Sequence, residues 1–307
     1  MKPMALAAAL LAAAIATRAP AQDQPGRDLP QALGMDVTLQ TDADDTDVVR
    51  VGVNLDADYQ GPEEYLGLRL ERVWFNPLDR GWKDRERVYL RAADSLDGWK
   101  WAATIGTDGD TVLGSASVHD EARFRKELFV ERDLLETPEG LDRGLYYTFA
   151  GAAIDRPAND RNLVTLVAGV QEFTGDNVRL HARANFIHVL DPEQGLSAQV
   201  RTRWFRNSVP READYYSPRW YAQVLPVLQL RRTTDDGWRY LLAGGIGLQR
   251  DSDSGWRRSG YLNAQVTTPP VTDGWALTAG ALYTDTPTAS GLGYRYFQAS
   301  IGVVRAF

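Results

Sequence analysis

Apolar and polar residues alternate along most of this chain. The segments 66–70 (LGLRL), 180–186 (LHARANF) and 262–266 (LNAQV) all repeat with a period of two. The last fourteen residues, 294–307 (YRYFQASIGVVRAF), do the same, and Arg305 is the charged exception on their apolar face. This period is typical of β-strands whose two faces meet different surroundings. The pattern therefore predicts an all-β protein.

The alternating segments predict sixteen strands, with fourteen as the alternative count. Their expected ranges are 34–41, 47–57, 65–75, 86–94, 99–107, 111–118, 123–132, 145–155, 162–173, 178–190, 196–207, 219–232, 238–250, 257–268, 275–285 and 294–307. A tilted strand needs about 9–11 residues to cross a bilayer, so these lengths suit a transmembrane antiparallel β-barrel. No later run of 18 apolar residues occurs, which excludes a helical membrane protein.

Periodicity alone does not say which face meets water, because soluble barrels alternate with their apolar side inward. Here the polar faces carry Arg, Glu and Gln interspersed with Gly, which favours a water-filled lumen. The expected lumen residues are Arg69, Arg183, Gln199, Arg201, Arg203, Arg231, Gln249, Gln265 and Gln298. Guanidinium and amide groups make directed hydrogen bonds to hydroxyl or carboxylate oxygens. These residues predict either a carbohydrate path or a set of Arg–Glu pairs that fills the barrel.

The tripeptide Asp-Gly-Trp occurs three times, each time where a strand is expected to begin. Asp-Gly suits the tight turns that join antiparallel strands. The tryptophans that follow are Trp99, Trp238 and Trp275, and in the sixteen-strand count all three lie on the same side. Because tryptophan gathers at membrane interfaces, they are expected to form part of an aromatic girdle. The alternative is that tryptophan simply favours strands and packs on a neighbouring turn.

The longest expected connections are 76–85, 133–144 and 208–218, and each follows an odd-numbered strand. Outer-membrane barrels have short periplasmic turns and longer external loops. With both termini in the periplasm, all three connections are expected to be external.

The N-terminus has the composition of a secretory signal peptide over residues 1–21. Lys2 supplies the positive region, residues 4–16 are apolar, and Ala19-Pro20-Ala21 is a small-x-small cleavage site. We expect a short polar leader over 22–33 and a barrel over 34–307. The chain contains no cysteine, so it has no disulfide framework.

Charge and motifs exclude several function classes. Removing residues 1–21 takes away two of the 34 basic residues and none of the 41 acidic ones, and this acidity argues against nucleic-acid binding. The three histidines (His119, His181 and His188) have no metal-ligand spacing, and no hydrolase elbow occurs. The glycine-rich run 244–247 lies within an alternating segment, so it is not expected to cradle a phosphate. We therefore expect no enzyme activity, no metal and no cofactor.

One stretch resembles a known family. The chain reads YYSPRWY over 215–221, and 173–177 (FTGDN), 291–296 and the terminal Phe307 are also similar to that family. Together they resemble the C-terminal barrel of exopolysaccharide exporters, namely the cellulose-synthase export barrel and the poly-N-acetylglucosamine export porin. The resemblance covers about residues 125–307. It implies sixteen strands, passage of a polymer through the lumen, and a loop at the external mouth formed by Tyr215, Tyr216, Ser217 and Pro218.

The resemblance also implies a location and partners. A terminal aromatic such as Phe307 resembles the signal that the barrel-assembly machinery reads, in the outer membrane of a Gram-negative bacterium. The expected partners are outer-membrane lipid, this machinery, the exported polysaccharide and a separate periplasmic repeat protein, because the exporters carry helical repeats that this chain lacks. The alternatives are a general porin or a structural, surface-composition barrel with a filled lumen. A lipid-modifying barrel enzyme is less favoured.

Overall fold

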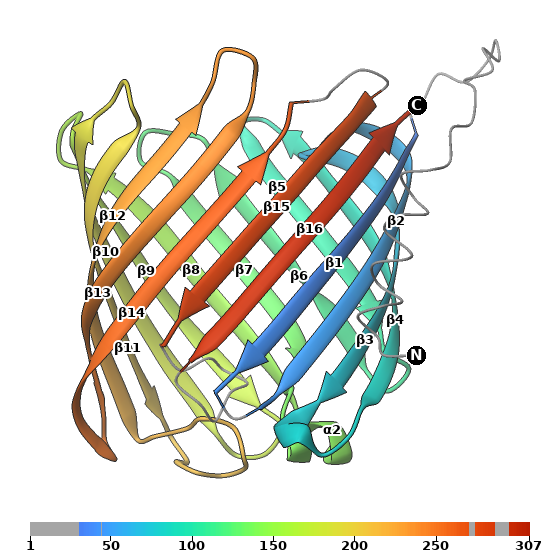
Figure 1. The fold of residues 1–307 in the computed structure, drawn as a ribbon, viewed down its shortest axis with the longest axis vertical. Helices are drawn as coiled ribbons and strands as arrows, with labels where there is room; N and C mark the ends of the chain where they lie inside the picture. The colour runs from blue at the N-terminus through green and yellow to red at the C-terminus, as the bar shows by residue number, and fades with distance from the viewer. Residues whose placement is uncertain (1–30, 44, 270–273, 286–294) are drawn as a thin grey trace.

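The computed structural model describes residues 31–43, 45–269, 274–285 and 295–307, and within them sixteen antiparallel strands close into a barrel (Figure 1). The strands are β1 (Ala32–Asp42), β2 (Asp47–Gly61), β3 (Glu64–Asn76), β4 (Lys83–Leu96), β5 (Trp99–Thr107), β6 (Val112–Asp120), β7 (Lys126–Leu134), β8 (Tyr146–Pro157), β9 (Asn162–Phe173), β10 (Val178–Asp191), β11 (Leu196–Asn207), β12 (Trp220–Thr233), β13 (Arg239–Asp251), β14 (Ser254–Thr267), β15 (Trp275–Thr284) and β16 (Tyr296–Ala306). The sixteen-strand prediction is confirmed, and the fourteen-strand count is wrong.

The first and last strands close the barrel. β1 pairs with β16 from Ala32 opposite Ala306 to Asp42 opposite Tyr296, and it pairs with β2 on its other side. Every strand therefore has two neighbours and no open sheet edge remains. β1 begins two residues before the predicted start of the barrel. The predicted signal peptide (1–21) and residues 22–30 of the predicted leader lie outside the described residues and remain predictions.

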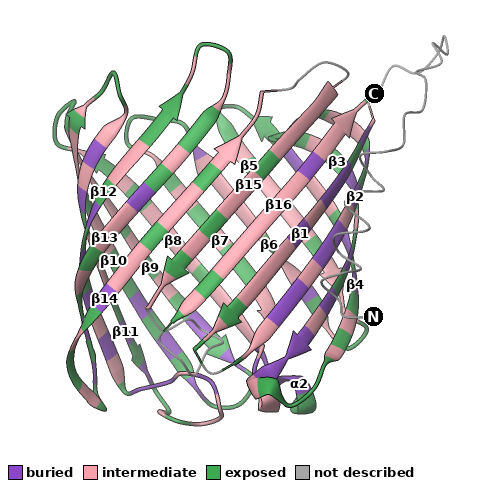
Figure 2. Ribbon diagram, in the orientation of Figure 1, coloured by how far each residue is buried: buried purple, intermediate pink, exposed green. Residues whose placement is uncertain are grey.

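The two faces of the wall differ in polarity. The strand register places apolar side chains such as Leu68, Leu90 and Leu242 on the outward face, each about half exposed. Figure 2 shows exposed and intermediate positions along the strands, interspersed with buried ones. So many large exposed apolar side chains would be unfavourable in water. The outward face therefore suits lipid, and the inward face lines a lumen.

The two ends of the barrel differ in their connections. We call the end where β1 begins and β16 finishes the terminal rim, and the opposite end the distal rim. The longest fully described connections, 77–82, 135–145 and 208–219, all follow odd-numbered strands and so lie at the same rim, the distal one. That this rim is external remains a prediction. Connections at the terminal rim include the two-residue turns 62–63 and 97–98.

Two short helices lie in the distal connections: η1 (Pro77–Asp79) and α2 (Pro138–Arg143). Thr137 caps α2, because its hydroxyl accepts a hydrogen bond from the Gly140 N–H at 3.0 Å. Gly144 ends the helix in the left-handed conformation (φ 67°). Among the described residues, no helix is long and apolar enough to cross a bilayer.

An apolar cluster anchors α2 at the distal end of the barrel. Leu141 of α2 joins Val73 and Phe75 of β3, which are fully buried and lie on the inward face. Arg85 of β4 donates a hydrogen bond to the Leu141 carbonyl at 3.2 Å. The connection 135–145 therefore folds against the inner wall instead of projecting away from the barrel.

Candidate functional site

All nine predicted lumen residues lie on the inward face of the wall. The register across adjacent strands places Arg183 opposite Arg203, Arg203 opposite Gln223, and Gln223 opposite Gln249. The same face continues through Gln265 of β14 and Gln298 of β16. The structure separates these residues into different surroundings, so they do not form one uniform lining.

One side of the lumen is an ion-pair network. Arg69 contacts Asp36 at 2.9 Å and Glu71 at 2.8 Å. Arg87, whose side chain is 0% exposed, contacts Glu71 at 3.2 Å and Asp133 at 3.0 Å. We call this region the paired wall; it comprises the inward faces of β1 to β4 together with Asp133 and Glu136. Buried charges are tolerated when each has an opposite partner, so the ion pairs of the paired wall hold these side chains against one another.

The other side carries arginines of a different kind, on the inward faces of β10 and β11. Arg201 donates hydrogen bonds to the neutral amide oxygens of Gln199 (3.0 Å) and Gln229 (3.1 Å). Its guanidinium carbon lies 4.9 Å from the centre of the Tyr261 ring. Among the described residues, Arg183 and Arg201 form no ion pair with a carboxylate. This side is therefore positively charged.

A pocket of about 330 Å³ is hollowed into this side of the lumen. Its polar lining comes mainly from Arg183, Arg201, Arg203, Asn185, Gln223 and Tyr261. We call it the arginine pocket. It brings together three of the predicted lumen residues, and Gln199 lies beside it through its hydrogen bond to Arg201.

The remaining predicted residues lie elsewhere on the inner wall. Gln249 is buried, and its amide is satisfied there: it accepts a hydrogen bond from the Tyr221 hydroxyl and donates one to the Asp285 carbonyl, both at 2.9 Å. Gln298 accepts from the Tyr296 hydroxyl at 2.8 Å. Arg231 lies near the terminal rim, opposite Leu241. Arg69 belongs to the paired wall.

The connection 208–219 carries the YYSP sequence and folds inward at the distal rim. Tyr215 is 2% exposed and stacks on Phe173 with 4.3 Å between ring centres. Its hydroxyl accepts a hydrogen bond from Asn177 at 2.8 Å, and burial raises the pKa of Tyr215 above its ordinary value. Tyr216 donates to Asp251 at 2.6 Å.

Ser217 and Pro218 complete this packing. The Ser217 hydroxyl accepts from the Arg211 N–H at 3.0 Å and donates to the Tyr215 carbonyl at 3.2 Å. The Pro218 carbonyl accepts a hydrogen bond from Asn207 of β11. The four residues thus hold the connection against the inner wall.

The two long distal connections contact each other, and we call 135–145 and 208–219 together the loop pair. Asp214 accepts hydrogen bonds from the Thr137 hydroxyl at 2.5 Å and from the Glu139 N–H at 2.7 Å. A carboxylate at a helix N-terminus is stabilised by the free N–H groups there. The second connection therefore caps the helix of the first.

Glu136 links the loop pair to the paired wall. Its carboxylate lies 2.6 Å from the guanidinium of Arg50 on β2. Burial raises the pKa of Glu136, and the attraction of Arg50 opposes this effect. Glu136 contacts β2 and Tyr216 contacts β13, so the loop pair is attached to the inner wall at two separate strands.

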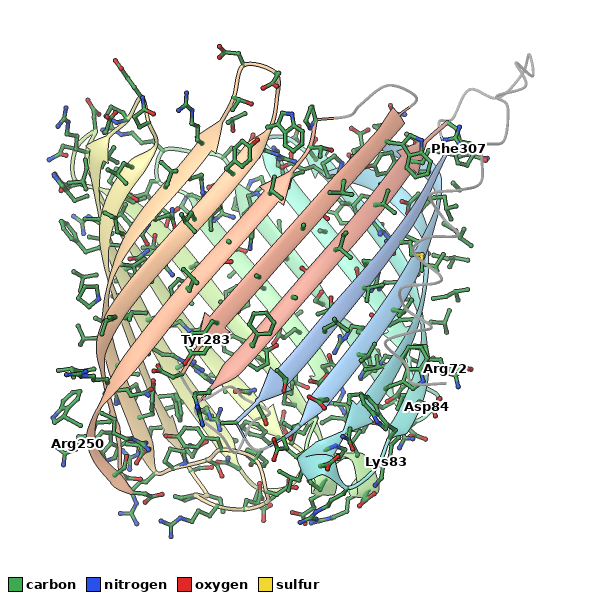
Figure 3. The ribbon with its side chains drawn as sticks, viewed as in Figure 1. Arg72, Lys83, Asp84, Arg250, Tyr283 and Phe307 are labelled. Atoms are coloured by element: carbon green, nitrogen blue, oxygen red, sulfur yellow. The ribbon has the colours of Figure 1, made fainter. Side chains whose placement is uncertain are left out.

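The three predicted girdle tryptophans, Trp99, Trp238 and Trp275, lie on the outward face at the terminal rim. Asp97 and Gly98 both have positive φ (50° and 80°), as the tight turn before Trp99 requires. Trp275 accounts for the charged Arg305 on the apolar face of β16, because the Arg305 guanidinium lies 5.3 Å from the centre of the Trp275 ring. Phe307 is at the same rim, whereas Arg72, Asp84 and Arg250 lie toward the distal rim (Figure 3).

No group of three or more His, Asp or Glu side chains among the described residues could hold a metal ion. His181 is buried against Phe149 and Phe205, and its Nε2 lies 3.0 Å from the Gln171 amide oxygen. Its role in the fold is therefore packing beneath the distal mouth.

In sequence, the chain matches no protein-family model and no curated protein. Its fold matches a bacterial polysaccharide outer membrane secretin with a TM-score of 0.66 at 12% identity, over 92% of this chain and 100% of that one. This chain folds as an outer-membrane β-barrel. The predicted resemblance to exopolysaccharide-export barrels is thereby confirmed for the fold.

Two other solved structures are less similar to this barrel. OprD of Pseudomonas aeruginosa has a TM-score of 0.46 at 8% identity, over 91% of this chain and 95% of that one. OmpT of Vibrio cholerae has a TM-score of 0.43 at 10% identity, over 93% of this chain and 100% of that one. TM-scores this low do not indicate a functional relationship to this chain.

The sequence analysis allowed for Arg–Glu pairs in the lumen but did not list their acidic members, and it missed the contact within the loop pair. Glu71 had a detectable signal, because it lies two residues from Arg69 on the same strand face. Glu136 and Asp214 had none, because they lie in connections whose folding no period describes.

Proposed function

We propose that this outer-membrane barrel passes a polysaccharide through its lumen without a chemical step. The observation that carries the proposal is the arginine pocket, where guanidinium and amide groups and the Tyr261 ring face the lumen together. Such groups donate multiple hydrogen bonds to sugar oxygens, and an aromatic ring packs on the apolar face of a sugar. The fold likeness to a polysaccharide secretin supports the same function.

The proposal includes a location and an assembly route. The chain is exported by its signal peptide (1–21), and the barrel-assembly machinery inserts it through the strand ending in Phe307. The terminal rim then faces the periplasm, with Trp99, Trp238 and Trp275 at the membrane interface, and the loop pair lies at the external mouth. A separate periplasmic repeat protein delivers the polymer.

The test is conductance of the folded protein in a planar bilayer, with and without neutral, acidic and cationic oligosaccharides. We expect channels that are blocked by at least one class of oligosaccharide. Arg201→Ala and Arg203→Ala are expected to lower anion selectivity while the barrel still folds. Channels that no sugar affects would instead indicate a general porin.

The loop pair and the paired wall favour a second candidate, a barrel with a closed lumen that serves a structural role at the cell surface. The buried contacts of Glu136 and Asp214 at the distal mouth support it. A protein that remains electrically silent, even after the contact of Asp214 is removed, would favour this candidate over the conduit.

A further inference from the structure

The arginine pocket contains three arginines, and no acidic residue contributes to its described lining. Arg183 is exposed to the lumen and forms no hydrogen bond or ion pair among the described residues. Arg201 donates to two neutral amide oxygens and lies over the Tyr261 ring. Arg183 and Arg201 therefore present positive charge to the lumen without a carboxylate in ion-pair contact among the described residues.

The register of the strands makes this arrangement costly for the empty barrel. Arg183 of β10 lies directly opposite Arg203 of β11. Arg201 precedes Arg203 by two residues and therefore lies on the same face of β11. Like charges directly opposite each other destabilise a sheet. In the paired wall, by contrast, Arg50, Arg69 and Arg87 each have a carboxylate within 2.6–3.2 Å. A bound anion would relieve the repulsion in the arginine pocket.

The rest of the lining suits a sugar better than a bare anion. Asn185 and Gln223 supply amides for hydroxyl groups, while Leu225 and Leu282 offer apolar contact beside the Tyr261 ring. The volume of about 330 Å³ is at the lower end for small-ligand sites. It therefore suits a short stretch of polymer at a time.

The planar guanidinium fork matches a carboxylate, to which it donates two parallel hydrogen bonds. We propose that the arginine pocket binds carboxylate-bearing sugar units, so that the polymer passing this barrel is an acidic polysaccharide. This inference rests on the proposed conduit function and specifies its substrate class.

The test compares trisaccharides of different charge on the full-length protein folded in detergent. Binding of tri-galacturonate, neutral cellotriose, cationic tri-glucosamine and inorganic phosphate is measured by calorimetry, which does not require an open channel. Block of conductance by the same four compounds is measured in a bilayer. Tri-galacturonate is expected to bind at least about tenfold more tightly than the other three, and its affinity is expected to fall with added salt.

Variants locate the site. The double variant Arg183→Gln with Arg201→Gln is expected to weaken tri-galacturonate binding by about tenfold or more. Arg231→Gln, which removes a lumen charge near the terminal rim, is expected to leave affinity within about twofold. Arginine-directed modification of the unaltered protein, mapped by mass spectrometry, provides a readout that needs no variant. Tri-galacturonate is expected to protect Arg183 and Arg201, but not Arg231.

The outcomes separate this inference from the proposed function. Stronger binding of cellotriose or tri-glucosamine would overturn the acidic substrate and leave the conduit intact. An open channel with no binding or block by any trisaccharide would overturn both. Phosphate binding as tightly as tri-galacturonate would indicate a general anion pore. Failure to protect Arg183 and Arg201 would show that the sugar binds elsewhere.

Discussion

Gly52 shows how closely the paired wall is packed. A Cβ atom built at this position would collide with the guanidinium of Arg69. Glycine therefore leaves the space in which Arg69 reaches both Asp36 and Glu71. The residue was not singled out by alternation, because glycine fits either face of a strand.

We expect Gly52→Ala to displace Arg69 and to lower the free energy of unfolding by about 1–3 kcal/mol, since polar groups of the pairs lose their partners. The measurement is the urea midpoint of the barrel in lipid vesicles. Gly244→Ala is the matched control, because the nearest atom to a Cβ there is a Leu262 methyl at 3.6 Å. Equal midpoints for the two variants would contradict this account.

At the scale of elements, the loop pair depends on Asp214. We expect Asp214→Ala to release α2 from the connection 208–219, because the Thr137 hydroxyl and the Glu139 N–H lose their shared acceptor. The expected results are faster proteolysis within 135–145 and larger single-channel conductance, with the strands intact. Asp235→Ala, an acidic residue in the terminal-rim connection 234–238, is the control. Unchanged proteolysis and conductance in Asp214→Ala would show that the contacts of Asp214 do not hold the two connections together.

The loop pair should also respond to pH through Glu136. Burial raises the pKa of Glu136 above its ordinary value of 4.5, so the loop pair docked on the wall binds a proton more tightly than a loop released into water. This contribution to docking of the loop pair is fully present below the ordinary pKa of Glu136 and is lost as pH rises through the raised pKa. Conductance recorded from pH 4 upward is therefore expected to increase with pH.

Glu136→Gln tests the assignment, because a side chain that cannot ionise removes this source of pH dependence. The nearby groups Arg50, Arg87, Asp133 and Glu71 remain in the variant. If the variant keeps the pH dependence of conductance, that dependence arises from one of these nearby groups and not from Glu136.

The sequence predicted strands better than connections for a physical reason. β5 and β9 begin and end where alternation placed them, because turn residues such as Asp97-Gly98 bound β5. β14 begins at Ser254, three residues before the predicted 257, because Asp251 pairs with Ser254 in a short turn. The contact between Glu136 and Arg50 joins positions 86 residues apart, and no local pattern encodes it.

At the scale of the whole molecule, the outward face must meet lipid. Leu90, near the middle of β4, is 56% exposed on that face, and Leu96 lies where the strand ends at the terminal rim. We expect Leu90→Arg to destabilise the bilayer-inserted barrel by about 2–4 kcal/mol and Leu96→Arg by about 0–1 kcal/mol. Reversible urea unfolding in lipid vesicles measures both. Equal small costs would mean that this face is not embedded.

The closure of β1 on β16 brings the two described ends of the barrel together. The Gln31 N–H donates to the Phe307 carbonyl at 3.0 Å, and the Phe307 N–H donates to the Gln31 carbonyl at 2.9 Å. Nothing in the ring of strand pairings therefore requires the chain to start at β1. A circular permutant that links Phe307 to Gln31 and opens the turn at 97–98 would retain all sixteen strand pairings. It would also make Phe307 internal, which separates the requirement for a closed barrel from the requirement for a free terminal aromatic residue during insertion.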